Sequence, residues 1–209
     1  MTQRMLLGVM VCFSTGVVHA EEVEDYPSAK VSYADFKDLI DEVESHRAER
    51  LVGLDVFLEM AQDPNTIILD TRSAHRYDRI HVAGATHLNF SDFNQASLAE
   101  AIPSLDTRVL IYCNNNFDGN PVDFVTKVAM PASVLSNDGA RSEMEIVEEE
   151  RPVMMALNVP TYIHLYGYGY QNVYELDELV DVADERIRFA GSVVSKSLPE
   201  PSRRLILRD

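Results

Sequence analysis

The 209-residue sequence has few cysteines, few basic residues and no long apolar run. It contains 2 cysteines and no tryptophan, and its 18 Lys and Arg residues stand against 34 Asp and Glu residues, for a formal net charge of −16. A negative balance this large disfavours nucleic acid and anionic membrane surfaces as partners, and no basic patch is large enough to reverse it. The sequence also lacks a phosphate-binding loop, a dinucleotide-binding fingerprint and a serine nucleophile elbow.

The N-terminal segment has the features of a secretory signal peptide. In residues 1–20, Arg4 precedes an apolar stretch, and a plausible cleavage site follows Ala20. The stretch is too short to span a membrane, so we expect a periplasmic or secreted mature protein with no membrane association once the signal is removed. A lipoprotein lipidated at Cys12 is a lesser alternative, because the residues before it are not small. Cleavage leaves Cys113 as the single cysteine, which excludes an intramolecular disulfide.

The remaining chain alternates between apolar runs and amphipathic segments. Such alternation predicts an α/β fold with a mostly parallel central sheet flanked by helices. The strands are expected at 50–52, 66–69, 85–88, 109–113, 172–176 and 187–190, and the helices at 32–43, 54–62, 73–77, 98–102, 121–130, 160–166 and 177–182, with a further helical turn at 153–157.

Composition also divides the chain into segments. We expect an acidic leader and an N-terminal helix in residues 21–49, the domain itself in residues 50–192 and a tail in residues 193–209. Residues 131–158 interrupt the domain with an acidic, polar stretch. Acidic runs are usually solvated surface, so we interpret this stretch as an insertion on the outside of the domain.

Cys113 ends the buried strand that begins at Val109, and Asn120-Pro121 reads as the start of a helix. The pattern therefore predicts strand, loop and helix, with the thiol directed at the positive end of that helix. This setting lowers a thiol pKa, and the amides of the loop offer donors to an anion. The alternative is a buried cysteine that packs as a small hydrophobic residue.

Four segments together resemble the motifs of the rhodanese-like domain family, in the family's order and over about residues 50–190. They are Ile67–Ser73 with its Asp-x-Arg, the stretch from Tyr77 through His81-Val82-Ala83-Gly84-Ala85 to Asn89-Phe90, Leu110–Cys113, and Gly169–Leu176 with Gly-Tyr-x-Asn-Val. The resemblance implies a sulfurtransferase without a cofactor, in which Cys113 takes a sulfane sulfur from a small donor and passes it, as a persulfide, to a thiol or cyanide-like acceptor. It implies a substrate- or anion-binding loop formed by Asn114, Asn115, Asn116, Phe117, Asp118, Gly119 and Asn120.

The loop departs from the family pattern in its charge. Family loops often carry an Arg, whereas this one contains Asp118 and no basic residue. A carboxylate beside an anion site opposes thiosulfate by like-charge repulsion and raises a neighbouring thiol's pKa. The alternative function is a catalytically weak binding module, whose acidic insertion and Tyr-rich segment (residues 161–170) would contact a protein partner.

Three further residues are candidates for supporting the site. Asp70 and Arg72 either fix the fold or orient the loop, with the structural role favoured. His81 is expected to be a hydrogen-bonded structural residue rather than a base. The histidines do not show metal-ligand spacing, so no metal site is predicted.

Overall fold

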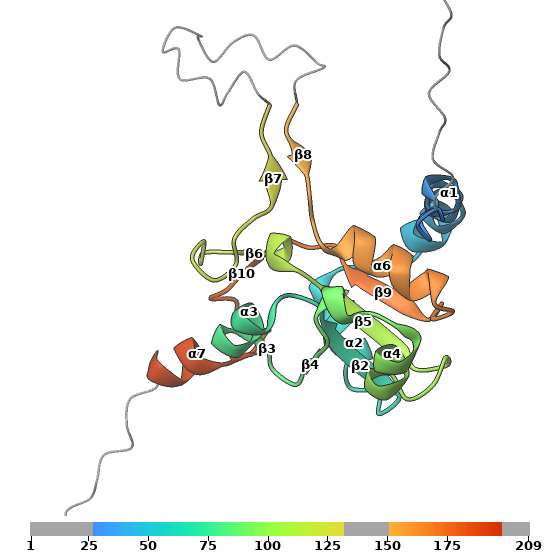
Figure 1. Cartoon of the computed structure of the whole chain (residues 1–209). Helices are drawn as coiled ribbons and strands as arrows, with labels where there is room; N and C mark the ends of the chain where they lie inside the picture. The colour runs from blue at the N-terminus through green and yellow to red at the C-terminus, as the bar shows by residue number, and fades with distance from the viewer. Residues whose placement is uncertain (1–26, 132–150, 198–209) are drawn as a thin grey trace, which may run out of the picture. The chain divides into compact units, whose positions relative to one another are not determined.

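The computed structural model describes residues 27–131 and 151–197 (Figure 1). The chain divides between Ser32 and Tyr33, and the elements below belong to the unit that begins at Tyr33. A five-stranded sheet with the order β1-β9-β5-β2-β4 forms its centre, and every neighbouring pair in it is parallel. The mixed α/β architecture predicted from the sequence is confirmed. The sheet strands are β1 (Leu51–Val52), β2 (Thr66–Asp70), β4 (Thr86–His87), β5 (Arg108–Tyr112) and β9 (Val173–Leu176).

Helices and short strand pairs surround this sheet. The helices are α1 (Tyr33–Ala48), α2 (Leu54–Met60), α3 (Ala74–Arg79), α4 (Gln95–Ala101), α6 (Asn158–Gly167) and α7 (Ser192–Ser197), with 3-10 turns η1 (Phe90–Asp92) and η2 (Asn114–Asn116). The short strands pair as β3 (His81–Val82) with β11 (Phe189–Ala190), β6 (Phe117–Asp118) with β10 (Val180–Asp181), and β7 (Val128–Ala129) with β8 (Val153–Met154).

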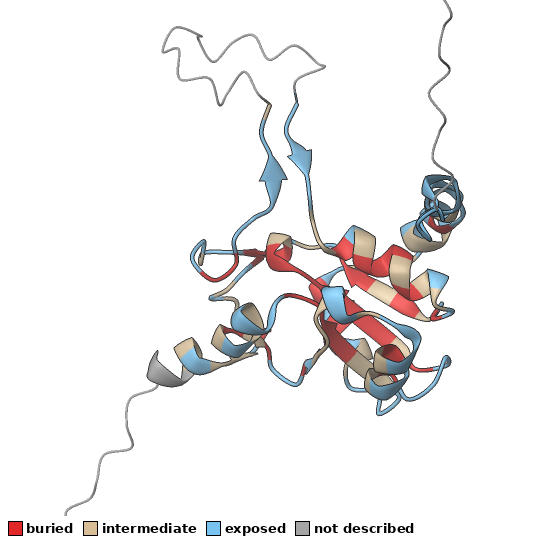
Figure 2. Ribbon diagram, viewed as in Figure 1, coloured by how far each residue is buried: buried red, intermediate tan, exposed pale blue. Residues whose placement is uncertain are grey.

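The central strand β5 divides the hydrophobic core into two layers. Successive side chains of a strand point to opposite faces of the sheet. Val109 and Ile111 pack with the buried residues of α1, α4 and α6, whereas Leu110 and Tyr112 pack with those of α2 and of the short strands. All four side chains are at most 1% exposed, and Figure 2 shows the central strands as the buried part of the molecule. A continuous apolar run is the sequence expected for a strand covered on both faces.

The register of the sheet aligns the carboxyl ends of its two central strands. Asp70, the last residue of β2, lies opposite Tyr112, the last residue of β5. The segments that follow the two strands therefore begin at the same edge of the sheet. Polar residues after either strand are brought together there, which is where sites lie in open α/β sheets.

The helix predicted at 121–130 is wrong. Asn120 does accept a hydrogen bond from the Asp123 backbone N–H (3.1 Å), but only one turn forms, and the chain then extends into β7. Two influences override the capping signal. The segment is rich in β-branched residues, which favour extended backbone, and its end is paired with β8.

The helix predicted at 177–182 is also wrong, because its residues serve other elements. The Glu178 carboxylate accepts a hydrogen bond from the Leu54 N–H (2.7 Å) and so caps α2 from a distance. Val180 and the residue after it form β10 against β6. The helical turn predicted at 153–157 is replaced at its start by β8, and the predicted tail begins with a helix, α7.

Several predictions fall outside the described residues. These are the signal peptide, most of the acidic leader, most of the insertion and the end of the tail. In the part of the chain that the structure describes, no helix is long and apolar enough to cross a membrane.

Candidate active site around Cys113

Cys113 lies directly after β5, as predicted, and its backbone is extended (φ −142°, ψ −171°). The Asn116 side chain holds this position by accepting a hydrogen bond from the Cys113 N–H (2.9 Å) and by donating one to the Leu176 carbonyl (2.7 Å). Cys113 as a residue is 1% exposed. Its sulfur accepts a hydrogen bond from the Asn115 N–H at 3.4 Å.

A helix N-terminus does face the thiol, but it is not the predicted one. Backbone N–H groups of Leu157 and Asn158 donate toward the Cys113 sulfur, in addition to that of Asn115. Leu157 is the N-cap of α6 and Asn158 its first residue. The positive end of a ten-residue helix that begins 45 positions further along the chain thus takes the place of the helix expected at 121–130.

The electrostatic balance at Cys113 also differs from the prediction. Burial raises the pKa of the Cys113 thiol above its ordinary value, and the three backbone N–H groups oppose this rise without cancelling it, while the charge of Glu175 adds to it. The sequence had suggested a lowered pKa from the helix dipole. Desolvation wins because a thiolate loses its hydration when it is enclosed, which costs more than three amide hydrogen bonds return.

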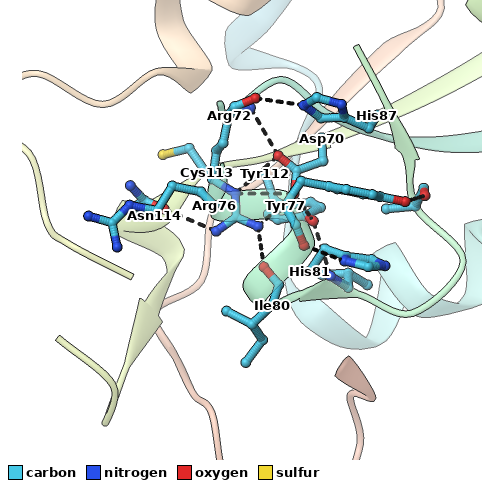
Figure 3. Close-up of polar contacts among 12 residues, drawn as sticks. Asp70, Arg72, Arg76, Tyr77, Ile80, His81, His87, Tyr112, Cys113 and Asn114 are labelled. Atoms are coloured by element: carbon cyan, nitrogen blue, oxygen red, sulfur yellow. Dashed lines mark hydrogen bonds and ion pairs between the residues drawn. The ribbon is translucent and has the colours of Figure 1, made fainter. Parts of the chain in front are cut away.

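Asp70 and Arg72 form a buried network behind the cysteine (Figure 3). The Arg72 guanidinium donates to both oxygens of Asp70 (2.6–3.1 Å), and the Tyr112 hydroxyl donates to the same carboxylate (2.5 Å). Arg72 also donates to the side-chain oxygen of Asn114 (3.1 Å) and to the Ile80 carbonyl (2.6 Å). The pair therefore both fixes the fold and holds the first residue of the loop, so the two roles considered for it coincide.

A cavity of about 390 Å³ opens beside Cys113. Three of the residues that line it are cationic: Arg72, Arg76 from α3, and Lys127 just before β7. The described residues that line this cavity include no Asp or Glu. The described residues that line the cavity are Thr71, Arg72, Ser73, Arg76, Asn89, Phe90, Ser91, Cys113, Asn114, Asn115, Val125, Lys127 and Leu157.

The structure does not place Asp118 at the cavity, where its expected anion-repelling role would put it. Asp118 lies in β6, is exposed, accepts a hydrogen bond from the Gly119 N–H (2.7 Å) and does not line the cavity. Positive charge reaches the cysteine from outside the loop. Arg76 lies on α3, and nothing in its local sequence indicates that it borders the cysteine. The position of Lys127 had no local signal, because it depends on how the segment after the loop folds back.

Only part of the predicted loop borders the cavity. Asn114 and Asn115 line it, whereas the next five residues have other roles. Asn116 holds Cys113, Phe117 packs in the core against Tyr112, Gly119 turns with a φ of +83°, and Asn120 caps the turn after it. The loop thus supplies one amide to the sulfur and two polar side chains to the cavity.

His81 has the structural role expected of it. Its ring nitrogen Nδ1 is 2.7 Å from the Tyr77 carbonyl, and its ring stacks on that of Tyr77 with 3.8 Å between centroids. It does not line the cavity. No group of three or more His, Cys, Asp or Glu side chains in residues 27–131 and 151–197 is arranged to hold a metal ion.

The tyrosines of residues 161–170 pack inward to a large extent. Tyr162 and Tyr170 are buried in the core layer beneath α6, and Tyr166 and Tyr168 are partly buried against it. The Tyr162 hydroxyl donates to the Val173 carbonyl (3.1 Å), which joins the helix to the sheet. The partner surface considered for residues 161–170 is thus largely internal.

Comparison with known proteins finds a family model that matches the middle of the chain. Residues 54–144 match the model of the Rhodanese-like domain. The structure is similar to the crystal structure of the BH2092 protein from Bacillus halodurans, with 15% sequence identity and a TM-score of 0.37, over 65% of this chain and 74% of that one. No curated protein sequence matches the chain significantly.

Proposed function

The chain contains a rhodanese-like domain, a domain of the sulfurtransferase superfamily, and from this premise we propose that it is a sulfurtransferase that carries sulfur on Cys113. The observation that carries the proposal is the position of the thiol. Cys113 lines a cavity of about 390 Å³, where three backbone N–H groups point at its sulfur. Such donors stabilise negative charge on sulfur during transfer, whether it rests on the thiolate or on the persulfide.

The transfer consists of two displacements at sulfur. In the first, the Cys113 thiolate attacks the outer sulfur of thiosulfate, a Cys–S–S bond forms, the S–S bond of thiosulfate breaks, and sulfite leaves with the electron pair. In the second, a nucleophile such as cyanide or a thiolate attacks the outer sulfur of the persulfide and restores the Cys113 thiolate. Each step exchanges one nucleophile for another, so no oxidant, reductant or cofactor is required.

The charge of the cavity supports an anionic donor. Arg76 and Lys127 line it with Cys113, and Asp118 does not. The Arg76 guanidinium donates Nη1 to the Val122 carbonyl (2.5 Å), which holds the side chain in place and leaves its other nitrogens for a ligand. Planar guanidinium groups bind oxyanions well because several N–H donors point in one direction. Thiosulfate, which the loop sequence argued against, is therefore our proposed donor class.

Turnover tests this proposal. The chain is incubated with thiosulfate and cyanide, and sulfite and thiocyanate are measured together. We expect equal amounts of the two products, because one sulfur moves per cycle, and no products above background with Cys113→Ser. Equal turnover by Cys113→Ser, or none by a folded and reduced wild-type chain with thiosulfate, polysulfide or 3-mercaptopyruvate, overturns the proposal.

Burial of the thiol favours a second candidate, a binding module that does not turn over. Cys113 is 1% exposed and its pKa is raised by burial, as in cysteines that only pack. The exposed apolar residues of β8, Val153 at 54% and Met154 at 66%, would then belong to a protein-binding surface. A Cys113 that is inert to alkylation at every pH, in a chain that transfers no sulfur, is the result that selects this candidate.

The compartment is part of the proposal. We propose that residues 1–20 are removed after Ala20 and that the mature protein acts in the periplasm or outside the cell, where Cys113 is its only thiol. An exported protein whose mass corresponds to a chain starting at Glu21 supports this, and retention of residues 1–20 on the exported protein contradicts it.

A further inference from the structure

Lys127 differs from the other two cations of the cavity in how its charge is used. Arg72 is committed to Asp70, Asn114 and Ile80, and Arg76 donates to the backbone beside it. Lys127 is an exposed residue that lines the cavity, and it makes no ion pair with any residue that the structure describes. No described residue forms an ion pair with its ammonium group, so the three N–H donors of that group are available to a ligand.

The backbone of Lys127 is fixed to the Cys113 loop by one side chain. The Lys127 N–H donates to Oδ1 of Asn115 (3.0 Å), and Nδ2 of Asn115 donates to the Lys127 carbonyl (3.1 Å). The amide of Asn115 thus satisfies both backbone groups of Lys127, as a neighbouring strand would. Asn115 also directs its own N–H at the sulfur of Cys113 (3.4 Å). One loop residue therefore contacts the thiol and holds the cation.

Lys127 is also the base of the β7–β8 strand pair. Its carbonyl accepts a second hydrogen bond, from the Met155 N–H (3.0 Å), and the next residue, Val128, pairs with Met154. Lys127 thus belongs to the β7–β8 segment, which lies outside the five-stranded sheet. It stands where this segment contacts the loop that follows Cys113. Figure 1 shows β7 and β8 side by side, extending from the region of β6 and α6.

We propose, resting on the proposed function, that Lys127 adds to Arg76 in giving this site its preference for an anionic sulfur donor, and that Asn115 positions Lys127. The loop that bears the cysteine has no basic residue of its own. The cation is supplied instead by the base of the β7–β8 pair, through the two hydrogen bonds of Asn115. Selection of the donor is thus separated from the residues that hold the sulfur.

Binding of thiosulfate is the direct test, measured by calorimetry with the full mature chain carrying Cys113→Ser so that no sulfur is transferred. We expect Lys127→Gln to weaken binding roughly ten-fold and Lys127→Arg to retain it, with the difference shrinking as salt is added. Lys37→Gln is the matched control, because it removes the same charge from an exposed position on α1. It is expected to bind as the parent does.

A positioning role for Asn115 is tested by a kinetic cycle in the chain that retains Cys113. Asn115→Ala is expected to raise the KM for thiosulfate about as much as Lys127→Gln, with a smaller effect on kcat. In the double variant, Asn115→Ala should add little to Lys127→Gln, because it acts through the lysine. If Asn115 merely maintained the loop, Asn115→Ala would raise the KM for thiosulfate equally in the parent chain and in the Lys127→Gln variant. That result overturns the positioning role of Asn115.

The outcomes separate this proposal from the one on which it rests. Unchanged thiosulfate binding in Lys127→Gln, or a loss equal to that of Lys37→Gln, overturns the role of Lys127 while sulfur transfer on Cys113 still stands. Absence of thiosulfate binding in the Cys113→Ser chain also overturns it. In that case sulfur carriage from a polysulfide would still support the proposed function, whereas absence of carriage from every donor removes both.

Discussion

The cationic residues that line the Cys113 cavity are held in two opposite ways. In the first, Arg72 is enclosed with Asp70, and their side chains are 2% and 0% exposed. In the second, Arg76 is half-buried and Lys127 is exposed, and neither forms an ion pair with a described residue. A cation in a buried, saturated pair holds structure, and a cation with unused donors is available to a ligand. The same residue type thus has different roles according to its partners.

The largest effect is expected from breaking the buried pair. Asp70→Ala leaves the Arg72 guanidinium buried without its carboxylate and also removes the acceptor of the Tyr112 hydroxyl. We expect the free energy of unfolding to fall by about 3–5 kcal/mol, measured by urea denaturation. Asp41→Ala, which breaks the exposed pair with Lys37, is the control and should change it by less than about 0.5 kcal/mol. A loss at Asp70 no larger than at Asp41 would mean that the buried network does not stabilise the fold.

The second expected effect concerns the pKa of the Cys113 thiol. Because burial raises the pKa of the Cys113 thiol, the thiolate fraction is small at pH 7 and should keep rising beyond the pH at which an ordinary thiol is half ionised. Alkylation by iodoacetamide, followed from pH 6 to 10, should therefore have its midpoint above that of a free cysteine measured alongside. A midpoint below the reference would show that the N–H groups of α6 outweigh burial.

The same pKa shift has a consequence for stability. A group whose pKa is raised by folding stabilises the native state fully below its unfolded pKa, and this contribution is lost as the pH rises through the folded value. The wild-type chain should accordingly lose stability in the alkaline range relative to Cys113→Ser, which has no titrating thiol there. Parallel stability curves for the two chains from pH 8 to 10 would contradict the shift.

A smaller effect is expected at Arg76, whose guanidinium forms no ion pair with a described residue. Arg76→Gln removes a guanidinium that lines the cavity but takes no part in the Asp70 network. We expect the KM for thiosulfate to rise about ten-fold, with unfolding changed by about 1 kcal/mol or less. Steady-state kinetics and a denaturation curve on the same preparation separate the two effects. A large loss of stability with an unchanged KM would show that Arg76 stabilises the fold and does not bind thiosulfate.

The smallest effect is expected at Asp118. Its carboxylate does not line the cavity, so Asp118→Asn should change the KM for thiosulfate by less than about two-fold. The loop sequence alone predicts the opposite, namely a clear gain when the negative charge is removed. A several-fold fall in KM would restore that interpretation and would mean that the carboxylate acts on the donor over a distance.

Prediction from the sequence was accurate up to Cys113 and much less so between Asn114 and Leu157. From Thr66 to Cys113, apolar runs and turn residues determine the elements locally, so the strand ends were found and the cysteine was placed correctly. Between Asn114 and Leu157, the outcome depends on pairing with distant segments. The predicted cap at Asn120 forms, but the chain after it pairs with β8 instead of continuing as a helix.

The electrostatics of the site show the same limit. The helix at Pro160 was predicted, but nothing in its sequence indicates that its first N–H groups lie against Cys113. The sequence likewise contains no signal that Lys127 and Arg76 lie beside Cys113. Local patterns predict which elements form, whereas the neighbours of a buried thiol are determined by packing between elements.

The most direct measurement is the intact mass of the mature chain after incubation with thiosulfate, beside Cys113→Ser. Our account predicts a gain of one sulfur atom in the wild-type chain, its removal by cyanide, and no gain in the variant. A folded wild-type chain with a reduced thiol that gains no sulfur from thiosulfate contradicts the account of an anionic donor at this site, and a gain that persists in Cys113→Ser contradicts the assignment of the sulfur to Cys113.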